Sequence, residues 1–316
     1  MTRITVHCIL SVINSIKLTD ENMNANTVDK NCKEYDLMID WLITEKCNLT
    51  CPQCCAHSEY IGDSFAPEVI NIRGLKKFLD NSDKIIRISF TGGEPFLVKN
   101  FIEALEEITR NHFFSIITNL VGPNVKKMCE KIDPNRSTFI VASAHVDQLK
   151  RRNLMDRFLS NCIMVKEAGF NLNIHETAYP FILNRVDEYY KIFSEKGLEL
   201  NFMPFKGKWM GRYFPEDYTV EEVHRFNLEK DATFSPKIYN QKGMLCMAGY
   251  NIAAAKANGD IQPCWGFPVK IGNIYDTINL RNNLTRCPFD FCSCPVRIWE
   301  PYLYEKALEE ISAKKR

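Results

Sequence analysis

The sequence lacks an excess of charge of either sign, because 40 lysines and arginines stand against 39 aspartates and glutamates. This balance disfavours a broad surface for nucleic acid or another polyanion. The sequence also lacks an apolar run long enough to span a bilayer, and no small-residue cleavage site follows the short run VHCILSVI near the N-terminus. We therefore expect no membrane and no nucleic-acid partner, and we expect the protein in the cytoplasm.

Cysteine, in contrast, is abundant, with 13 residues in a chain of 316. A chain of this length can bury a sizeable core, so it does not need disulfides for stability. Clustered cysteines in a cytosolic protein indicate metal or redox chemistry more often than a disulfide framework. Four of them lie in single helices or without partner spacing, namely Cys8, Cys32, Cys129 and Cys162, and the others gather in two clusters.

Beyond a polar lead-in, the chain alternates short apolar runs with segments of helical period. The runs predict strands at 35–43, 84–90, 113–120, 137–146, 170–179 and 198–205, and the periodic segments predict helices at 67–82, 99–111, 123–132, 154–169 and 184–197. This alternation predicts an α/β fold with a parallel sheet and right-handed crossovers. An open doubly wound sheet and a partial barrel give the same pattern, and both place their sites at the carboxyl ends of the strands.

The first cysteine cluster, CNLTCPQCC, follows the first predicted strand. Cys47, Cys51 and Cys54 have the spacing C-x3-C-x2-C, and three thiolates on one loop suit three corners of an iron–sulfur cubane. The fourth iron would lack a protein ligand and remain open to a substrate or cofactor. Zinc is the alternative, with His57 completing a Cys3His set.

The second predicted strand ends in FTGGEPFL. Gly92 and Gly93 allow the backbone to approach a ligand closely, while Glu94 and Pro95 fix a turn. Because this turn lies one βα unit after the cysteine loop, both motifs are expected at the same edge of the sheet.

The cysteine loop followed by TGGEP closely resembles the radical S-adenosylmethionine (SAM) enzymes. The resemblance implies a partial (β/α)6 TIM-like barrel, a [4Fe–4S] cluster on Cys47, Cys51 and Cys54, and SAM bound at the open iron. It also implies a set of cofactor-binding residues: Gly92, Gly93, Glu94, Pro95, Thr118, Asn119, Ser143 and His145. His175, Glu176 and Thr177 face either SAM or substrate, or have a structural role.

Two residues of the loop depart from a plain three-ligand pattern. Gln53 stands where the family usually has an aromatic residue, which affects local packing around SAM rather than cluster binding. Cys55 is a surplus thiol. It is either a spare packed residue or, as a catalytic candidate, the donor of a hydrogen atom to a substrate radical, a role also open to one of the late cysteines.

The second cluster begins with Cys246 and Cys264, which bracket a hairpin predicted to turn on Asn258-Gly259. Three later cysteines, Cys287, Cys292 and Cys294, can close the site. The pattern resembles the twitch or SPASM extension of radical SAM enzymes, which implies one auxiliary iron–sulfur cluster; a structural zinc ribbon is the alternative. We expect a lead-in at 1–35, the barrel at 36–239, the auxiliary module at 240–300 and a C-terminal helix or tail at 301–316.

The resemblance implies an enzyme that cleaves SAM reductively and abstracts a hydrogen atom from a substrate, with an electron donor such as flavodoxin or ferredoxin. The segment FKGKWMGRYFPEDY at 205–218 is expected at the barrel mouth, where it either contacts a polar or anionic substrate or is a plain connection. The expected substrate residues there are Lys206, Lys208, Trp209, Arg212 and Tyr213.

The reaction itself is less constrained than the cofactor. The N-terminal segment is expected to be too small for a leader-binding domain, which favours oxidation, epimerisation or rearrangement of a small polar molecule. The alternatives are a peptide maturase that forms a cross-link or epimer, and a non-catalytic iron–sulfur protein for electron transfer or scaffolding.

Overall fold

The computed structural model describes residues 34–51, 54, 69–230, 241–289 and 300–314. Within this part of the chain one sheet has nine strands. They are β1 (Leu37–Thr44), β2 (Ile86–Gly92), β3 (Phe113–Thr118), β4 (Ser137–Ser143), β5 (Leu172–Ala178), β6 (Leu200–Pro204), β10 (Ile252–Ala255), β11 (Asp260–Gln262) and β12 (Gly272–Asn273). Their order is β12-β11-β10-β1-β2-β3-β4-β5-β6, and neighbours from β1 to β6 are parallel. The six predicted strands are therefore confirmed.

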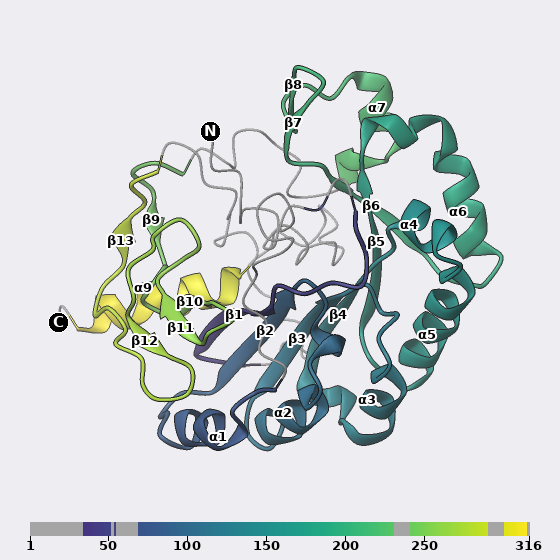
Figure 1. The fold of residues 1–316 in the computed structure, drawn as a ribbon. Coiled ribbons are helices and arrows are strands. Elements are labelled where there is room, and N and C mark those ends of the chain that lie inside the picture. The colour runs from purple at the N-terminus through teal and green to yellow at the C-terminus, as the bar shows by residue number, and fades with distance from the viewer. Residues whose placement is uncertain (1–33, 52–53, 55–68, 231–240, 290–299, 315–316) are drawn as a thin grey trace.

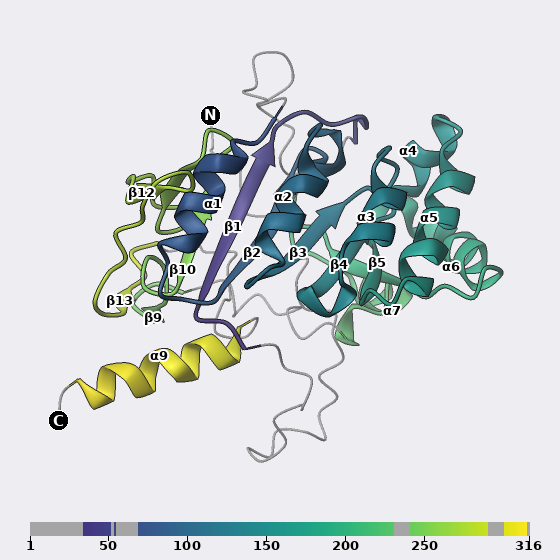
Figure 2. The same ribbon diagram turned by 90° about the horizontal axis from the view of Figure 1, so that it is seen from below.

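Helices follow the strands along the outer side of this curved sheet (Figures 1 and 2). They are α1 (Ile72–Asp80), α2 (Phe101–Ile108), α3 (Val125–Lys131), α4 (Val146–Arg151), α5 (Met155–Glu167) and α6 (Val186–Ser194), with α7 (Val220–Arg225) and α9 (Pro301–Ala313) further along the chain. Short 3-10 turns occur at Pro95–Leu97, Pro134–Arg136, Pro180–Arg185 and Leu228–Lys230. The five predicted helices are confirmed, whereas α4 was not expected. No helix in the described ranges has the length and apolarity needed to cross a bilayer.

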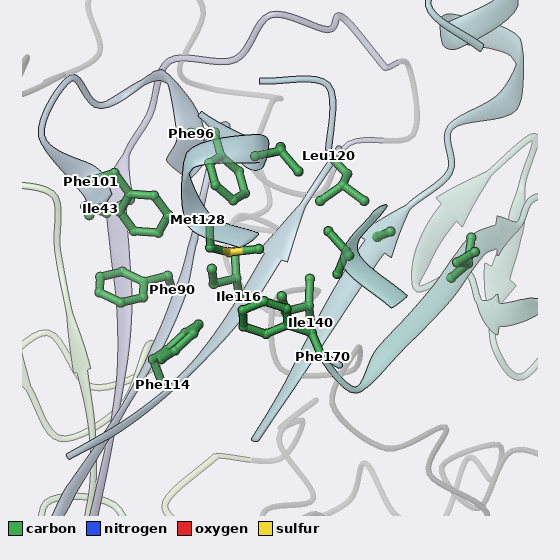
Figure 3. Close-up of a cluster of buried hydrophobic side chains, with 14 of the residues drawn as sticks. Ile43, Phe90, Phe96, Phe101, Phe114, Ile116, Leu120, Met128, Ile140 and Phe170 are labelled. Atoms are coloured by element: carbon green, nitrogen blue, oxygen red, sulfur yellow. The ribbon is translucent and has the colours of Figure 1, made fainter. Parts of the chain in front are cut away.

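The main core lies between the outer face of the sheet and these helices. Alternate residues of each strand point to it, such as Ile39 and Trp41 of β1 and Phe90 of β2. Figure 3 shows part of this layer, where Phe90, Phe96 and Phe101 meet edge to face. All eight residues of β1 are buried. This accounts for the nearly continuous apolar run in its sequence, which is typical of a parallel strand covered on both faces.

The hairpin predicted at Asn258-Gly259 is confirmed, because Ala254 pairs with Gln262 and Ala255 with Ile261 in antiparallel register. However, β10 also pairs with β1 in parallel, from Met38 opposite Ile252 to Trp41 opposite Ala255. The segment after residue 240 therefore extends the barrel sheet itself. A second small sheet joins β9 (Leu245–Cys246) to β13 (Thr285–Arg286), beside this edge.

A buried ion pair closes the inner face of the sheet near the amino ends of the strands. Arg87 of β2 pairs with Glu300, which immediately precedes α9, and the Tyr35 hydroxyl also bonds to Glu300. Met38, Phe139 and Leu303 belong to the apolar cluster on the same face. We call this group, formed by Tyr35, Met38, Arg87, Phe139, Glu300 and Leu303, the floor of the barrel. It connects the C-terminal helix to the first strands.

Replacing Arg87 by methionine should lower the free energy of unfolding by about 3 kcal/mol, because the Glu300 carboxylate would stay buried without its partner. The double variant Arg87→Met, Glu300→Leu should recover most of this loss, since it buries no charge. Urea denaturation of both variants measures the difference. A single variant as stable as the wild type would show that the pair does not hold the floor together.

Candidate active site

The cysteine loop leaves the carboxyl end of β1 and folds against the main core. Cys51 is buried, and Cys47 and Cys54 pack against the same core. The Cys54 backbone N–H donates to the Cys51 carbonyl at 3.1 Å, and the Leu49 N–H points at Cys47 Sγ at 3.4 Å. The three thiols expected to hold a cluster thus lie on one short, internally bonded loop.

The electrostatics of these thiols suit a site that is completed by metal. Burial raises the pKa of Cys51 above its ordinary value, and the neighbouring Cys54 and Cys47 raise it further. Burial raises the pKa of Cys47 as well, whereas N–H donors from Leu49 and Asn119 lower it. Donors aimed at sulfur stabilise a metal-bound thiolate. Iron would supply the positive charge that thiolates in this position need.

Within the described residues no three His, Cys, Asp or Glu side chains converge on a point where one metal ion would bind. A cubane cluster is held at separate corners, so its thiolates do not have to converge in this way. The lack of a converging group is therefore compatible with a cluster on the three cysteines. His57 lies outside the described residues, so the zinc alternative is not tested by the geometry.

The Gly-Gly-Glu-Pro turn is bonded directly to the start of the cysteine loop. The Gly93 N–H donates to the Thr44 carbonyl at 2.7 Å, and the Glu94 N–H donates to the Lys46 carbonyl at 2.8 Å. A Cβ on Gly92 would lie 2.2 Å from the Thr44 oxygen, and one on Gly93 would lie 2.0 Å from the Lys46 oxygen. The glycines thus permit a close approach to the chain's own backbone.

Glu94 is a fully buried carboxylate with three hydrogen bonds. It accepts from the Phe96 N–H at 3.0 Å, from Thr118 Oγ1 at 2.7 Å and from the Asn119 N–H at 2.7 Å. Burial raises the pKa of Glu94 to about 7, although these donors pull it down. Glu94 therefore joins the end of β2 to the end of β3. Pro95, also buried, begins the 3-10 turn that follows.

Asn119 extends this connection to the cysteine loop. Its side-chain amide donates to Asn48 Oδ1 at 2.7 Å and lies 3.7 Å from Cys47 Sγ. The Thr118 hydroxyl also accepts from the Leu120 N–H. Direct contact of Thr118 and Asn119 with SAM stays a prediction; what the geometry shows is that both position neighbouring groups. Asn48 was not singled out from the sequence, where a polar residue between two cysteines gives no separate signal.

The ends of β4 and β5 are also tied together. Ser143 is in register with His175, and the Glu176 carboxylate accepts from the Val146 N–H at 2.7 Å. His145, which precedes α4, has a left-handed backbone with φ of 38°, and its Nδ1 has no hydrogen-bond partner in the described chain. Burial lowers the pKa of His145 and of His175 to about 4, so both rings are neutral near pH 7. Contact of Ser143 and His145 with SAM stays a prediction.

Three of the five C-terminal cysteines lie in the described chain, and short contacts link their segments. Cys246 of β9 is in register with Thr285 of β13, and the Cys287 N–H donates to the Met244 carbonyl at 2.9 Å. The turn after Cys246 approaches the strand end before Cys264, since a Cβ on Gly249 would lie 3.2 Å from Pro263 Cβ. Cys246, Cys264 and Cys287 thus come from adjoining segments, as an auxiliary cluster requires.

The segment at 205–218 forms a hairpin, with β7 (Gly207–Trp209) antiparallel to β8 (Arg212–Phe214), which projects beyond the end of β6 (Figure 1). Arg212 pairs with Glu222 inside the chain, and Trp209 packs against Tyr179 with the two rings tilted by 53°. Lys206 is buried, whereas Tyr213 is exposed below the Lys208 ammonium. Arg212 is therefore already neutralised, which weakens the expectation that it binds an anionic substrate.

Besides His57, four residues of interest lie outside the described part of the chain, namely the catalytic candidate Cys55, the packing residue Gln53, and the late cysteines Cys292 and Cys294. Sequence reasoning also passed over Asp40, a buried acid in the apolar strand LMIDWLIT, whose Oδ2 accepts from Trp265 Nε1 at 2.6 Å. A lone acid in a strand that is buried on both faces is itself a signal, since such a group needs a partner.

The sequence model of the Radical SAM superfamily matches residues 41–191, which contain the cysteine loop and the Gly-Gly-Glu-Pro turn. Residues 41–191 accordingly form a radical SAM domain. An uncharacterized protein of Methanocaldococcus jannaschii is 32% identical over 96 residues, which cover 28% of this chain and 32% of that protein. The match therefore spans about a third of that relative.

Solved structures share the fold. The structure of anSMEcpe with bound AdoMet is 20% identical, with a TM-score of 0.52, and the likeness covers 76% of this chain and 78% of that one. Streptococcus suis SuiB bound to S-adenosylmethionine is 16% identical, with a TM-score of 0.51 over 76% of this chain and 64% of that one. The predicted partial barrel is thereby confirmed.

Proposed function

We propose that this enzyme binds a [4Fe–4S] cluster on Cys47, Cys51 and Cys54, cleaves SAM there, and acts on a small polar molecule held inside the barrel. The observation that carries the proposal is the pair of backbone hydrogen bonds from Gly93 and Glu94 to the start of the cysteine loop. They join the segment expected to contact SAM to the segment expected to hold the cluster.

Cys47, Cys51 and Cys54 would hold a cluster that, once reduced by an external donor, would supply the one electron that cleaves a C–S bond of SAM. This chemistry would give methionine and a 5′-deoxyadenosyl radical able to take a hydrogen atom from the substrate. The chain's own residues bind and orient SAM and substrate and exclude water. A flavodoxin or ferredoxin as donor stays a prediction. So do the cytoplasmic location and the absence of a nucleic-acid partner.

We place an auxiliary iron–sulfur cluster on four of the cysteines Cys246, Cys264, Cys287, Cys292 and Cys294. The adjoining segments of the first three support it. An auxiliary cluster held there would supply an acceptor for one electron of the substrate radical, and with loss of a proton from the substrate the net reaction would be a two-electron oxidation. If no electron leaves, a hydrogen atom returned by a thiol such as Cys55 gives an epimer instead.

A peptide substrate is the second candidate, and a specific observation favours it. SuiB has been solved bound to precursor peptide SuiA, and anSMEcpe with the Cp18Cys peptide. These peptides are known of those proteins only. Both candidates require SAM cleavage, so the first experiment addresses what they share.

The test is anaerobic reconstitution of the full chain with iron and sulfide, followed by SAM and dithionite and an assay for 5′-deoxyadenosine. We expect the wild type to form it and a variant with alanine at Cys47, Cys51 and Cys54 to form none. An intact cluster without SAM cleavage would favour the non-catalytic iron–sulfur alternative. Zinc without iron in the purified protein would overturn both.

A further inference from the structure

A row of three polar side chains crosses the inner face of the barrel sheet. Asp40 of β1 is in register with Ser89 of β2, and Ser89 is in register with Ser115 of β3. In a parallel sheet, residues in register share a face and adjacent strands lie about 4.8 Å apart. The row faces inward because Ile39 and Trp41, the neighbours of Asp40, pack in the outer core.

These three side chains are almost completely buried, with exposed fractions of 1% for Asp40 and 0% for both serines. Asp40 Oδ1 and both serine hydroxyl oxygens have no hydrogen-bond partner within the described part of the chain. A buried polar atom without a partner destabilises a fold by about 1–3 kcal/mol. A bound molecule that paired with these three atoms would remove this cost.

The next inward-facing row toward the amino ends of the strands has much larger side chains, one of them charged. Two residues nearer the amino ends, Met38, Arg87 and Phe113 are in register, and Met38 and Arg87 form part of the floor. On the other side, Asp40 lies four residues before Thr44, where the cysteine loop begins, a rise of about 13 Å along the strand. The row therefore lies within the barrel, between the floor and the edge that carries the SAM motifs.

The chemistry of the row selects its ligand. Oδ2 of Asp40 already accepts from Trp265, so Oδ1 is the atom that remains to accept a hydrogen bond. Serine hydroxyls both donate and accept, as do the hydroxyls of an alcohol. An anionic ligand would lie against a carboxyl group whose nearest cation, Arg87, already pairs with Glu300. Burial raises the pKa of Asp40 to about 7 because the dry interior disfavours a charged carboxylate, and the same burial disfavours an anionic ligand.

We propose that Asp40, Ser89 and Ser115 form a substrate subsite for a neutral, polyhydroxylated small molecule. The assignment rests on the proposed function, since it takes the barrel interior as the place where substrate meets the SAM-derived radical. It deepens that function by naming the substrate class, and it makes these three residues positioning residues for the substrate.

The first test needs no ligand. If the row serves binding and not folding, Asp40→Asn, Ser89→Ala and Ser115→Ala should each leave the Tm of the holoenzyme at or above the wild-type value. The control Thr138→Val removes a hydroxyl that does have a partner, the Phe114 carbonyl at 3.2 Å, and should lower the Tm. A fall in Tm in all three row variants would assign the row a structural role and overturn the proposal.

The second test uses glucose, myo-inositol and glucuronate, of which glucose and glucuronate differ only in a carboxylate at one carbon. We expect at least one neutral polyol at high concentration to raise the Tm of the wild-type holoenzyme, with glucuronate inactive and the shift lost in the triple row variant. An equal shift with glucuronate, an unchanged shift in the triple variant, or no shift with either polyol would overturn the assignment. SAM cleavage by the wild type without a polyol tests the proposed function separately.

Discussion

Replacing Gly93 by alanine should reduce cluster incorporation to background. The new Cβ would lie 2.0 Å from the Lys46 carbonyl oxygen and 2.3 Å from its carbon, and both atoms belong to backbone that has no flexible end to move aside. The cysteine loop or the turn must shift, and the hydrogen bond from the Glu94 N–H to Lys46 is then lost. Iron content and visible absorbance after anaerobic reconstitution measure the effect.

Gly197→Ala is the matched control for this substitution. Gly197 follows α6 with φ of 66°, and no atom lies within 4 Å of a Cβ built there. A left-handed alanine costs about 1–2 kcal/mol, so the control should lose some stability while it binds iron normally. Normal iron content in Gly93→Ala would show that the turn and the loop are not coupled in the way the backbone hydrogen bonds indicate.

The sequence predicted the barrel strands well because each is a short apolar run between helices of clear period. It did not predict that β10 joins β1, since the strand has four residues, three of them alanine, with no strong strand preference. Such pairing depends on which strand lies at the unpaired edge of the parallel sheet in three dimensions, here β1. The segment after residue 240 therefore read as a separate unit, although its hairpin extends the barrel sheet.

In the candidate site, too, features within one short segment could be predicted from the sequence, whereas contacts between distant segments could not. Spacing predicted Cys47, Cys51 and Cys54 as cluster ligands because the pattern lies within one loop. It could not show that Gly92 and Gly93 approach the Thr44 and Lys46 carbonyls, because this contact joins two strands far apart in sequence. The inner row escaped notice for a similar reason, since only register brings Asp40, Ser89 and Ser115 together.

Glu94 takes part in most of the contacts that join the ends of neighbouring strands in this site. Its carboxylate takes donors from its own turn and from the end of β3, and Asn119, which it holds through the backbone, aims its amide at Cys47. Within the described residues, Glu94 is the acceptor for the Asn119 N–H. Loss of this carboxylate should therefore lower the stability of the fold and also disturb the position of the cysteine loop.

Glu94→Ala should lower the free energy of unfolding by about 5 kcal/mol, because the N–H groups of Phe96 and Asn119 and the Thr118 hydroxyl would lose their acceptor in a buried place. It should also lower iron content, since Asn119 would no longer be held beside Cys47. Glu94→Gln keeps one carbonyl acceptor and should lose less of both. Urea denaturation and iron analysis of the two variants distinguish these effects, and an alanine variant as stable as the wild type would contradict a positioning role for Glu94.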